Sequence, residues 1–353
     1  MSSNPQNQSN LWLFRFAALT AFVTFLLIGL GGLVTSHGAG MSVPDWPNTY
    51  GYNMFAFPLS KWVGGIFYEH THRLLASAVG LLTTILAAWL WLVDSRRWMK
   101  WLGLAAFLGV VVQGILGGLR VTLHMDSLGV FHATIAQLFF ILVCAIALFL
   151  SRFWRALAAG KNHFFVSRGL RTLVLATTVL ILLQLIIAAT MRHQHAGLAI
   201  SDFPLAHGKI WPDTSAAALA SYNALRVSVT EEAPITAFQI ELQMVHRVLA
   251  VAILILVAGG ASQAWRRLGG NDSLAKLALF WLALILMQVA LGAATIWTNK
   301  AADVATAHVM VGALSLVTGA LWCLIGFGRS AASLTEKQPP GVFGVQASML
   351  ANK

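Results

Sequence analysis

Four histidines occupy matched positions in the two halves of the chain: His72, His132, His246 and His308. The first two are 60 positions apart, and the last two are 62 positions apart. An imidazole side chain can ligate a metal ion or exchange a proton near neutral pH. The near-equal spacing therefore predicts two equivalent pairs of side chains that do one of these two kinds of chemistry.

The segments around the histidines repeat as well. Internal similarity of this kind indicates one structural unit that is used twice. We accordingly divide the chain into an N-terminal half, residues 1–165, and a C-terminal half, residues 166–353. The matched segments are Gly38–Pro47 with Ala196–Pro204, Glu69–Ala76 with Gln243–Ala250, Gln113–Gly117 with Gln288–Gly292, and Phe131–Ala133 with Ala307–Val309.

The elements that carry these residues are expected to be membrane-spanning helices. Of the 353 residues, 58% are hydrophobic and 10% are charged, which is far more apolar than a soluble domain. A bilayer core about 30 Å thick needs about 20 apolar residues for each helical crossing. The apolar segments lack the alternation of membrane β-strands, so an all-α integral membrane protein is predicted. Its eight spans are 12–34, 69–93, 101–120, 128–150, 172–191, 237–262, 276–297 and 304–327.

The distribution of charge predicts how these helices are oriented. The formal net charge is +11, and the basic residues cluster in the connections after the second, fourth and sixth spans. Connections rich in lysine and arginine stay in the cytoplasm, so both termini are expected there and nucleic acid is not expected as a partner. The first span lacks a small-residue cleavage site and is interpreted as a retained helix. With four helices per half, both halves enter the membrane from the same side, which predicts two four-helix bundles related as a parallel repeat.

All four histidines fall within about two turns of the predicted outer ends of their helices. Helix bundles hold cofactors with side chains that project inward from facing helices, and imidazole is a common ligand of haem iron. We therefore predict that His72 with His132, and His246 with His308, each supply ligands to a haem. A zinc or di-iron site is less favoured, because thiolates and carboxylates do not converge at this level. The alternatives are a histidine hydrogen-bonded in the interfacial region and a proton relay.

Two arginines, Arg73 and Arg247, each follow one of these histidines. An arginine inside a span costs about 2.5–3.5 kcal/mol on insertion scales unless it finds a partner or reaches water. The haem propionates would be a suitable anionic partner, and an extended side chain that reaches water is the alternative. Arg73 and Arg247 are therefore candidate propionate partners.

The repeat breaks its symmetry at one ionisable position. Glu69 stands three residues before His72, whereas Gln243 stands three residues before His246. A spacing of three places both side chains on the same face of a helix. A carboxylate can carry a proton and an amide cannot, so Glu69 is the candidate catalytic residue. The alternative is a carboxylate exposed among the lipid headgroups.

Six further histidines lie in or near the outer loops and are expected to be mostly solvated. Among them, His70 and His124 could border the outer face of the first site. The chain has two cysteines, both within predicted spans, so a disulfide framework is not indicated. The six histidines are His37, His70, His124, His193, His195 and His207.

Together these motifs resemble the haem A synthase family, and the similarity covers nearly the whole chain. The resemblance implies an oxidoreductase acting on a CH or CH3 group, which oxidises a ring methyl of haem O through a hydroxymethyl stage to the formyl group of haem A. It also implies that His246 and His308 ligate a resident haem b, that His72 and His132 flank haem O, and that Glu69 takes part in catalysis. The similarity rests on Gly38–Pro47, Glu69-x-x-His72-Arg73, Gln113–Gly117, Phe131-His132, Gln243-x-x-His246-Arg247 and His308.

The same resemblance implies a cellular setting. It implies a bacterial cytoplasmic (inner) membrane, haem O handed over by a haem O synthase, a membrane electron donor such as quinol, and a homo-oligomer. The product would serve the biogenesis of haem-copper terminal oxidases. One departure concerns the first outer loop, where many bacterial members carry a cysteine pair and this chain has none. Any redox role of that pair does not transfer, and packing of Trp46 and Pro47 must hold the loop instead.

Two other functions are compatible with parts of the pattern. A two-haem b-type cytochrome that takes electrons from quinol would need the same four histidines but not Glu69. A transporter would also show parallel repeats with polar residues in the membrane. In this chain, however, the polar residues lie near the outer surface and not at the midplane, which makes a transporter the least favoured of the three.

Overall fold

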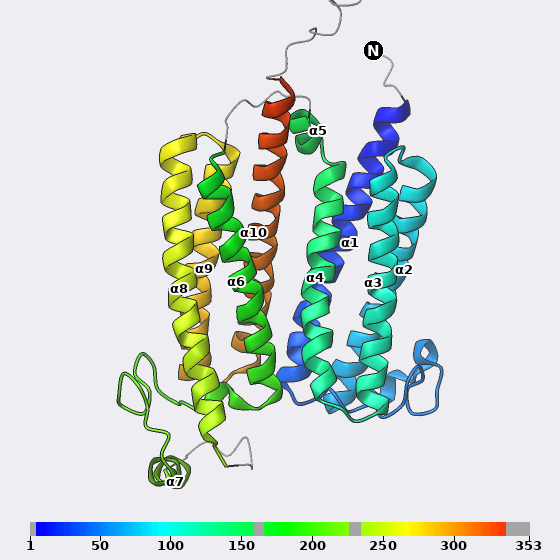
Figure 1. Ribbon diagram of the computed structural model, residues 1–353. Coiled ribbons are helices and arrows are strands. Elements are labelled where there is room, and N and C mark those ends of the chain that lie inside the picture. Colours follow the sequence, from blue (N-terminus) through cyan, green and yellow to red (C-terminus); the bar gives the residue numbers. More distant parts are fainter. Residues whose placement is uncertain (1–4, 159–165, 226–233, 337–353) are drawn as a thin grey trace, which may run out of the picture.

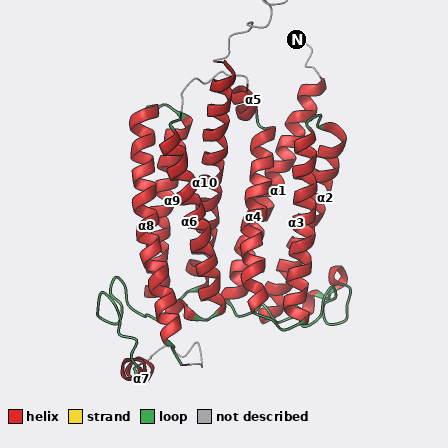
Figure 2. Ribbon diagram, in the orientation of Figure 1, coloured by secondary structure: helices red, strands yellow, loops and turns green. Residues whose placement is uncertain are grey.

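The computed structural model of this protein describes residues 5–158, 166–225 and 234–336 (Figure 1). The predicted boundary between the halves, at residue 165, lies outside the described residues. Among those residues there is no β-strand, as Figure 2 shows. The helices are α1 (Pro5–Ser36), η1 (Met54–Ala56), η2 (Leu59–Lys61), α2 (Gly64–Val93), α3 (Arg97–Thr122), α4 (Ser127–Leu150), α5 (Arg152–Ala158), α6 (Arg168–His193), η3 (Ala196–Leu198), α7 (Ala216–Ala224), α8 (Ala237–Leu268), α9 (Ser273–Trp297) and α10 (Ala302–Glu336).

Eight of these helices are long and apolar enough to cross a membrane, and each predicted span lies inside one of them. This confirms the prediction of an all-α, multi-pass membrane protein. The helices extend beyond the predicted spans because a helix satisfies its backbone within itself and continues past the last apolar residue. At α8, for example, the helix begins at a capping box formed by Thr236 and Gln239 and ends at Gly269, which has a φ of 81°.

The spanning helices form two closed rings of four neighbours. In one ring α1 contacts α2 and α4, and α3 contacts the same two helices. In the other ring α6 contacts α8 and α10, and α9 contacts the same two helices. The rings stand side by side in Figure 1 and meet where α1 and α4 contact α10 and where α4 contacts α6. This arrangement is consistent with the predicted parallel repeat.

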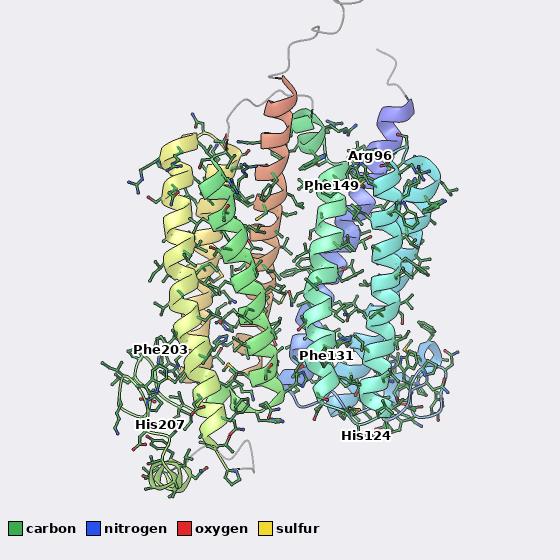
Figure 3. The ribbon with its side chains drawn as sticks, in the orientation of Figure 1. Arg96, His124, Phe131, Phe149, Phe203 and His207 are labelled. Atoms are coloured by element: carbon green, nitrogen blue, oxygen red, sulfur yellow. The ribbon has the colours of Figure 1, made fainter. Side chains whose placement is uncertain are left out.

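The two ends of the molecule differ. One end, which we call the loop end, carries residues 37–63, 123–126, 194–225 and 298–301, together with η1, η2, η3 and α7 (Figures 1 and 2). Figure 3 labels His124, Phe203 and His207 at this end. At the opposite end Arg96 donates a hydrogen bond to the carbonyl of Phe149 (3.1 Å; Figure 3).

Each ring has its own apolar core, and neither core reaches the loop end. Within these two cores the buried residue of α2 nearest His72 is Val79, and the buried residue of α8 nearest His246 is Ile253. Seven residues of helix span about 10 Å. The two cores therefore lie toward the opposite end from the histidines, and a separate apolar cluster that includes Ile200, Ile240 and Met244 packs the second outer loop onto the start of α8.

Candidate haem sites at the loop end

The four predicted histidines lie on α2, α4, α8 and α10, one on every second spanning helix. Each stands between the sixth and the tenth residue of its helix, counted from the loop end. At 1.5 Å per residue this places them within about 6 Å of one another in depth. The structure therefore brings the histidines to one level, two in each ring.

The pair in the second ring is close enough to share a metal ion. The ring centroids of His246 and His308 are 6.4 Å apart, and the ring planes make an angle of 64°. A metal ion held about 2 Å from one nitrogen of each of two opposed imidazoles separates their centroids by about 6 Å. The spacing of this pair thus fits two axial ligands on either side of a haem iron.

The pair in the first ring differs in its surroundings. In the described part of the chain no ring contact joins His72 to His132, although the two are near enough to interact electrostatically. Arg120 of α3 is also near enough to both rings to influence them electrostatically.

The two nitrogens of each ring have different surroundings. In each imidazole Nδ1 is buried, while the residue as a whole is partly exposed. A metal-ligating histidine presents one ring nitrogen to the metal and turns the other toward the protein. The burial of Nδ1 at four equivalent places therefore leaves Nε2 as the nitrogen that could ligate a haem iron.

A clamp of side chains holds the first outer loop over the start of α2. The Glu69 carboxylate accepts hydrogen bonds from the backbone N–H of Val43 (2.8 Å) and from Arg73 (2.7 Å). Arg73 also donates to the backbone carbonyls of Val43 (2.8 Å), Asp45 (2.6 Å) and Asn48 (3.0 Å). All four terminal N–H groups of Arg73 therefore have acceptors within the protein, and Glu69 is buried and not exposed among headgroups.

The second ring has the same clamp with an amide in place of the carboxylate. The side chain of Gln243 accepts from the N–H of Ile200 (2.8 Å) and donates to its carbonyl (3.2 Å). Arg247 donates to the carbonyls of Asp202 (2.8 Å) and Leu205 (2.8 Å), and its Nε is buried without a hydrogen-bond partner among the described residues. Both clamps thus tie a loop to the helix that carries the first histidine of each ring.

The aspartates at the centre of the two loops act alike. Asp45 accepts from the N–H groups of Tyr50 (2.7 Å) and Gly51 (2.8 Å), and Asp202 accepts from those of His207 (2.6 Å) and Gly208 (2.8 Å). Burial alone would raise the pKa of Asp45. The backbone hydrogen bonds and the charge of Arg73 outweigh it and hold that pKa below its ordinary value. The carboxylate therefore stays ionised and organises the turn.

Comparison with known proteins agrees with this architecture. The cytochrome oxidase assembly protein family matches residues 52–320, which is most of the chain. The chain belongs to this family. Relatives named heme A synthase include that of Halalkalibacterium halodurans, 25% identical over 86% of this chain and 93% of the relative, and that of Methylobacterium radiotolerans, 25% identical over 93% of each chain. A third, from Geobacillus kaustophilus, is 26% identical over 83% of this chain and 84% of the relative.

This membership confirms the resemblance inferred from the sequence motifs. The eight apolar helices are those of a multi-pass membrane protein. The loop that lacks the cysteine pair is held by other contacts. In addition to the clamp, the ring of Trp46 lies directly against Gly118 of α3.

Two of the loop-end histidines are not solvated as expected. His70 is fully buried, packs against Phe57 and Trp62, and bonds through Nδ1 to the hydroxyl of Thr49 (3.1 Å). His193, at the end of α6, lies against Gly129 of α4 in the other ring. Position near a helix end predicted exposure, but the folded loops and the contact between rings cover both side chains.

Two arginines near the sites were missed by the sequence reasoning. Arg120 interacts with His72 and His132 and pairs with Asp126 (3.2 Å). Arg192 donates to the carbonyl of Gly32 (2.6 Å) and to the Ser36 hydroxyl (2.6 Å), across the boundary between rings. Neither arginine has an arginine counterpart in the other half, so a search based on the repeat could not find them.

Proposed function

We propose that this protein is a haem A synthase, which oxidises a ring methyl of haem O through a hydroxymethyl stage to the formyl group of haem A. The observation that carries the proposal is the set of four histidines at one level, two per ring, in a member of this family. Relatives that match nearly the whole chain bear the name heme A synthase. The reaction class, acting on a CH or CH3 group, follows from that chemistry.

The two sites are proposed to divide the work. His246 and His308, with ring centroids 6.4 Å apart, would hold a resident haem b. When bound, that haem supplies one-electron redox chemistry. His72 and His132 would bind the substrate haem O. An enzyme needs an exchangeable site for its substrate and a fixed site for its cofactor, and the ring contact of His246 with His308, together with the position of Glu69 three residues from His72, supports this assignment.

Glu69 is proposed to carry a proton at the substrate site. It is buried three residues from His72, and each of its carboxylate oxygens has one hydrogen-bond donor. Each oxygen keeps a second lone pair that could take up a proton while its present donor stays in place. Neutralising the carboxylate would weaken its ion pair with the Arg73 guanidinium. Proton movement at Glu69 would therefore be linked to the hold on the first loop.

The propionate role remains a proposal, and the geometry ranks its two candidates. Arg247 has an unpartnered Nε, so it can still donate a hydrogen bond to a carboxylate. Arg73 would have to exchange one of its present bonds, because its terminal N–H groups already donate to Val43, Asp45, Asn48 and Glu69. The better candidate is Arg247.

The proposed setting is the bacterial cytoplasmic membrane, with both termini in the cytoplasm and the loop end outside. Haem O synthase as the source of substrate, quinol as the electron donor, a homo-oligomeric state and the division at residues 165 and 166 belong to the same proposal. The net charge of +11 and the position of the basic connections support the orientation.

The experiment that tests the function is haem analysis after expression of the whole chain together with a source of haem O. Haem extracted from purified protein and membranes is separated by chromatography. The proposal expects haem A and a hydroxymethyl intermediate, together with haem b on the protein. Haem b alone, without haem A, would favour a two-haem cytochrome, and absence of haem under haem-replete conditions would favour a transporter.

A further inference from the structure

Each of the four candidate histidines has a pair of associated positions on the spanning helix that comes before its own helix in the chain. The four pairs occupy equivalent places in the repeat. We call these pairs the histidine supports. The members of a pair are four residues apart, which puts them on one helix face, and the second member is always small. The supports are Leu27 with Gly31 for His72, Gln113 with Gly117 for His132, Gln184 with Ala188 for His246, and Gln288 with Gly292 for His308.

The glycines let the imidazoles come close to the helix backbone. A Cβ atom on Gly31 would lie 3.2 Å from Cε1 of His72. The same construction on Gly117 gives 3.4 Å to His132, and on Gly292 it gives 3.3 Å to His308. These are close approaches on three different helices, so the glycine of each of these three supports sets where the ring lies.

Two of the glutamines hold the backbone of a ligating turn. Nε2 of Gln113 donates to the carbonyl of His132 (3.2 Å), and Nε2 of Gln184 donates to the carbonyl of His246 (2.9 Å). Nε2 of Gln288 lies 2.8 Å from the place of a Cβ on Gly312, one turn beyond His308 on α10. An amide bonded to the ligand's own peptide group restricts how far the histidine can shift.

One support lacks the amide. At the position that corresponds to the glutamines, the support of His72 has Leu27, which packs against the apolar core of the first ring and has no hydrogen-bond donor. Gly31 still receives the ring of His72, but the peptide group of His72 is not bonded by this position. Of the four supports, that of His72 is thus the one without a side-chain hydrogen-bond donor.

We propose that Gln113 and Gln184 are positioning residues that fix two haem-ligating turns, and that Leu27 leaves His72 as the adjustable ligand through which substrate haem is admitted and product haem is released. This inference rests on the proposed function. A resident haem has to stay, whereas a substrate haem has to leave after each turnover. Outer contacts that orient a metal ligand typically change metal affinity by about 10- to 100-fold, so a missing one is a means of permitting release.

The test measures haem loss and not turnover. The purified whole protein, loaded by co-expression with a haem O source, is mixed with excess apomyoglobin, and the haem remaining on it is separated by chromatography over time. Leu27→Gln supplies the missing donor and should slow the loss of haem O and haem A about two- to tenfold, the range of one hydrogen bond. The loss of haem b should stay unchanged. Leu27→Met, which has similar size but no donor, is the matched control and should behave like the wild type.

The reverse change keeps the inference testable if Leu27→Gln does not fold. Gln184→Leu should speed the loss of haem b about two- to tenfold and broaden its low-spin electron paramagnetic resonance signal, and Gln184→Glu, protonated in this apolar place, should restore part of the hold. Equal haem loss from wild type, Leu27→Gln and Gln184→Leu would overturn the inference while leaving the proposed function intact. Absence of haem O and haem A from the wild type would instead overturn the proposed function, and the inference with it.

Discussion

The two loop clamps have the same geometry and different chemistry. In the first ring the carboxylate of Glu69 accepts a hydrogen bond from the N–H of Val43 and forms an ion pair with Arg73. In the second ring an amide, Gln243, satisfies both the N–H and the carbonyl of Ile200. The second ring shows that a loop can be held in this way without an ionisable group. The carboxylate of the first ring is therefore not explained by loop attachment alone, which favours a chemical role for Glu69.

The largest effect is expected from removing a ligand of the resident haem. His246→Ala or His308→Ala takes away one of two opposed imidazoles, and occupancy by haem b should fall by about tenfold or more. The haem-to-protein ratio and the low-spin signal measure this loss. His37→Ala, which alters an exposed histidine stacked on Tyr68, is the control and should keep both values. Survival of the low-spin signal in both ligand variants would contradict the assignment.

The next largest effect is expected from Glu69→Gln, which gives the first ring the residue type that the second ring has at Gln243. Glu69→Gln keeps an acceptor for the N–H of Val43 but cannot carry a proton, so haem binding should persist while formation of haem A falls by about 100-fold or more. Haem chromatography after co-expression measures both quantities. The reciprocal variant, Gln243→Glu, should change haem A formation little. Normal haem A formation by Glu69→Gln would remove the proton-carrying role.

Replacing Arg73 or Arg247 is expected to have a smaller effect, on thermal stability, and the two replacements are expected to differ. Arg73→Gln removes three hydrogen bonds between α2 and the first loop and one to Glu69 within α2, whereas Arg247→Gln removes two between α8 and the second loop. Hydrogen bonds from a charged donor contribute about 1.5–3 kcal/mol each when they are well formed. Arg73→Gln should therefore lower the thermal midpoint more and expose the first loop to protease. Equal shifts in the two variants would show that the clamps do not differ in strength.

The smallest effect concerns pH. The pKa of Asp45 is lower in the folded loop than its ordinary value of 3.8, so its contribution to stability is present above about pH 4 and is lost as the pH falls through the folded value. Limited proteolysis of the first loop between pH 3 and pH 7 should show protection that ends only in the acid part of this range. Asp45→Asn should remove that acid step, and a step that survives in this variant would have another origin.

Much of the fold and part of the site could be predicted from the sequence. Every predicted span lies within an observed helix. A single apolar segment in lipid can hydrogen-bond all of its backbone N–H and C=O groups only by forming a helix. The four histidines share one level because residue counts along a regular helix convert directly into depth. The short helices α5 and α7 were not predicted, since they lack the length and the hydropathy that made the spanning helices evident.

The chain by itself thus determined the helices, the repeat and the candidate ligands, all of which depend on local periodicity and on equivalent positions. Tertiary structure alone decided which groups meet: the bonds of Glu69 and Arg73 to the first loop, the burial of His70, and the contact of His193 with Gly129 in the other ring. These contacts join segments whose separation and direction follow from the packing of the helices and the course of the loops. No periodic pattern encodes them, and for that reason the four histidines were evident from the sequence while their different supports were not.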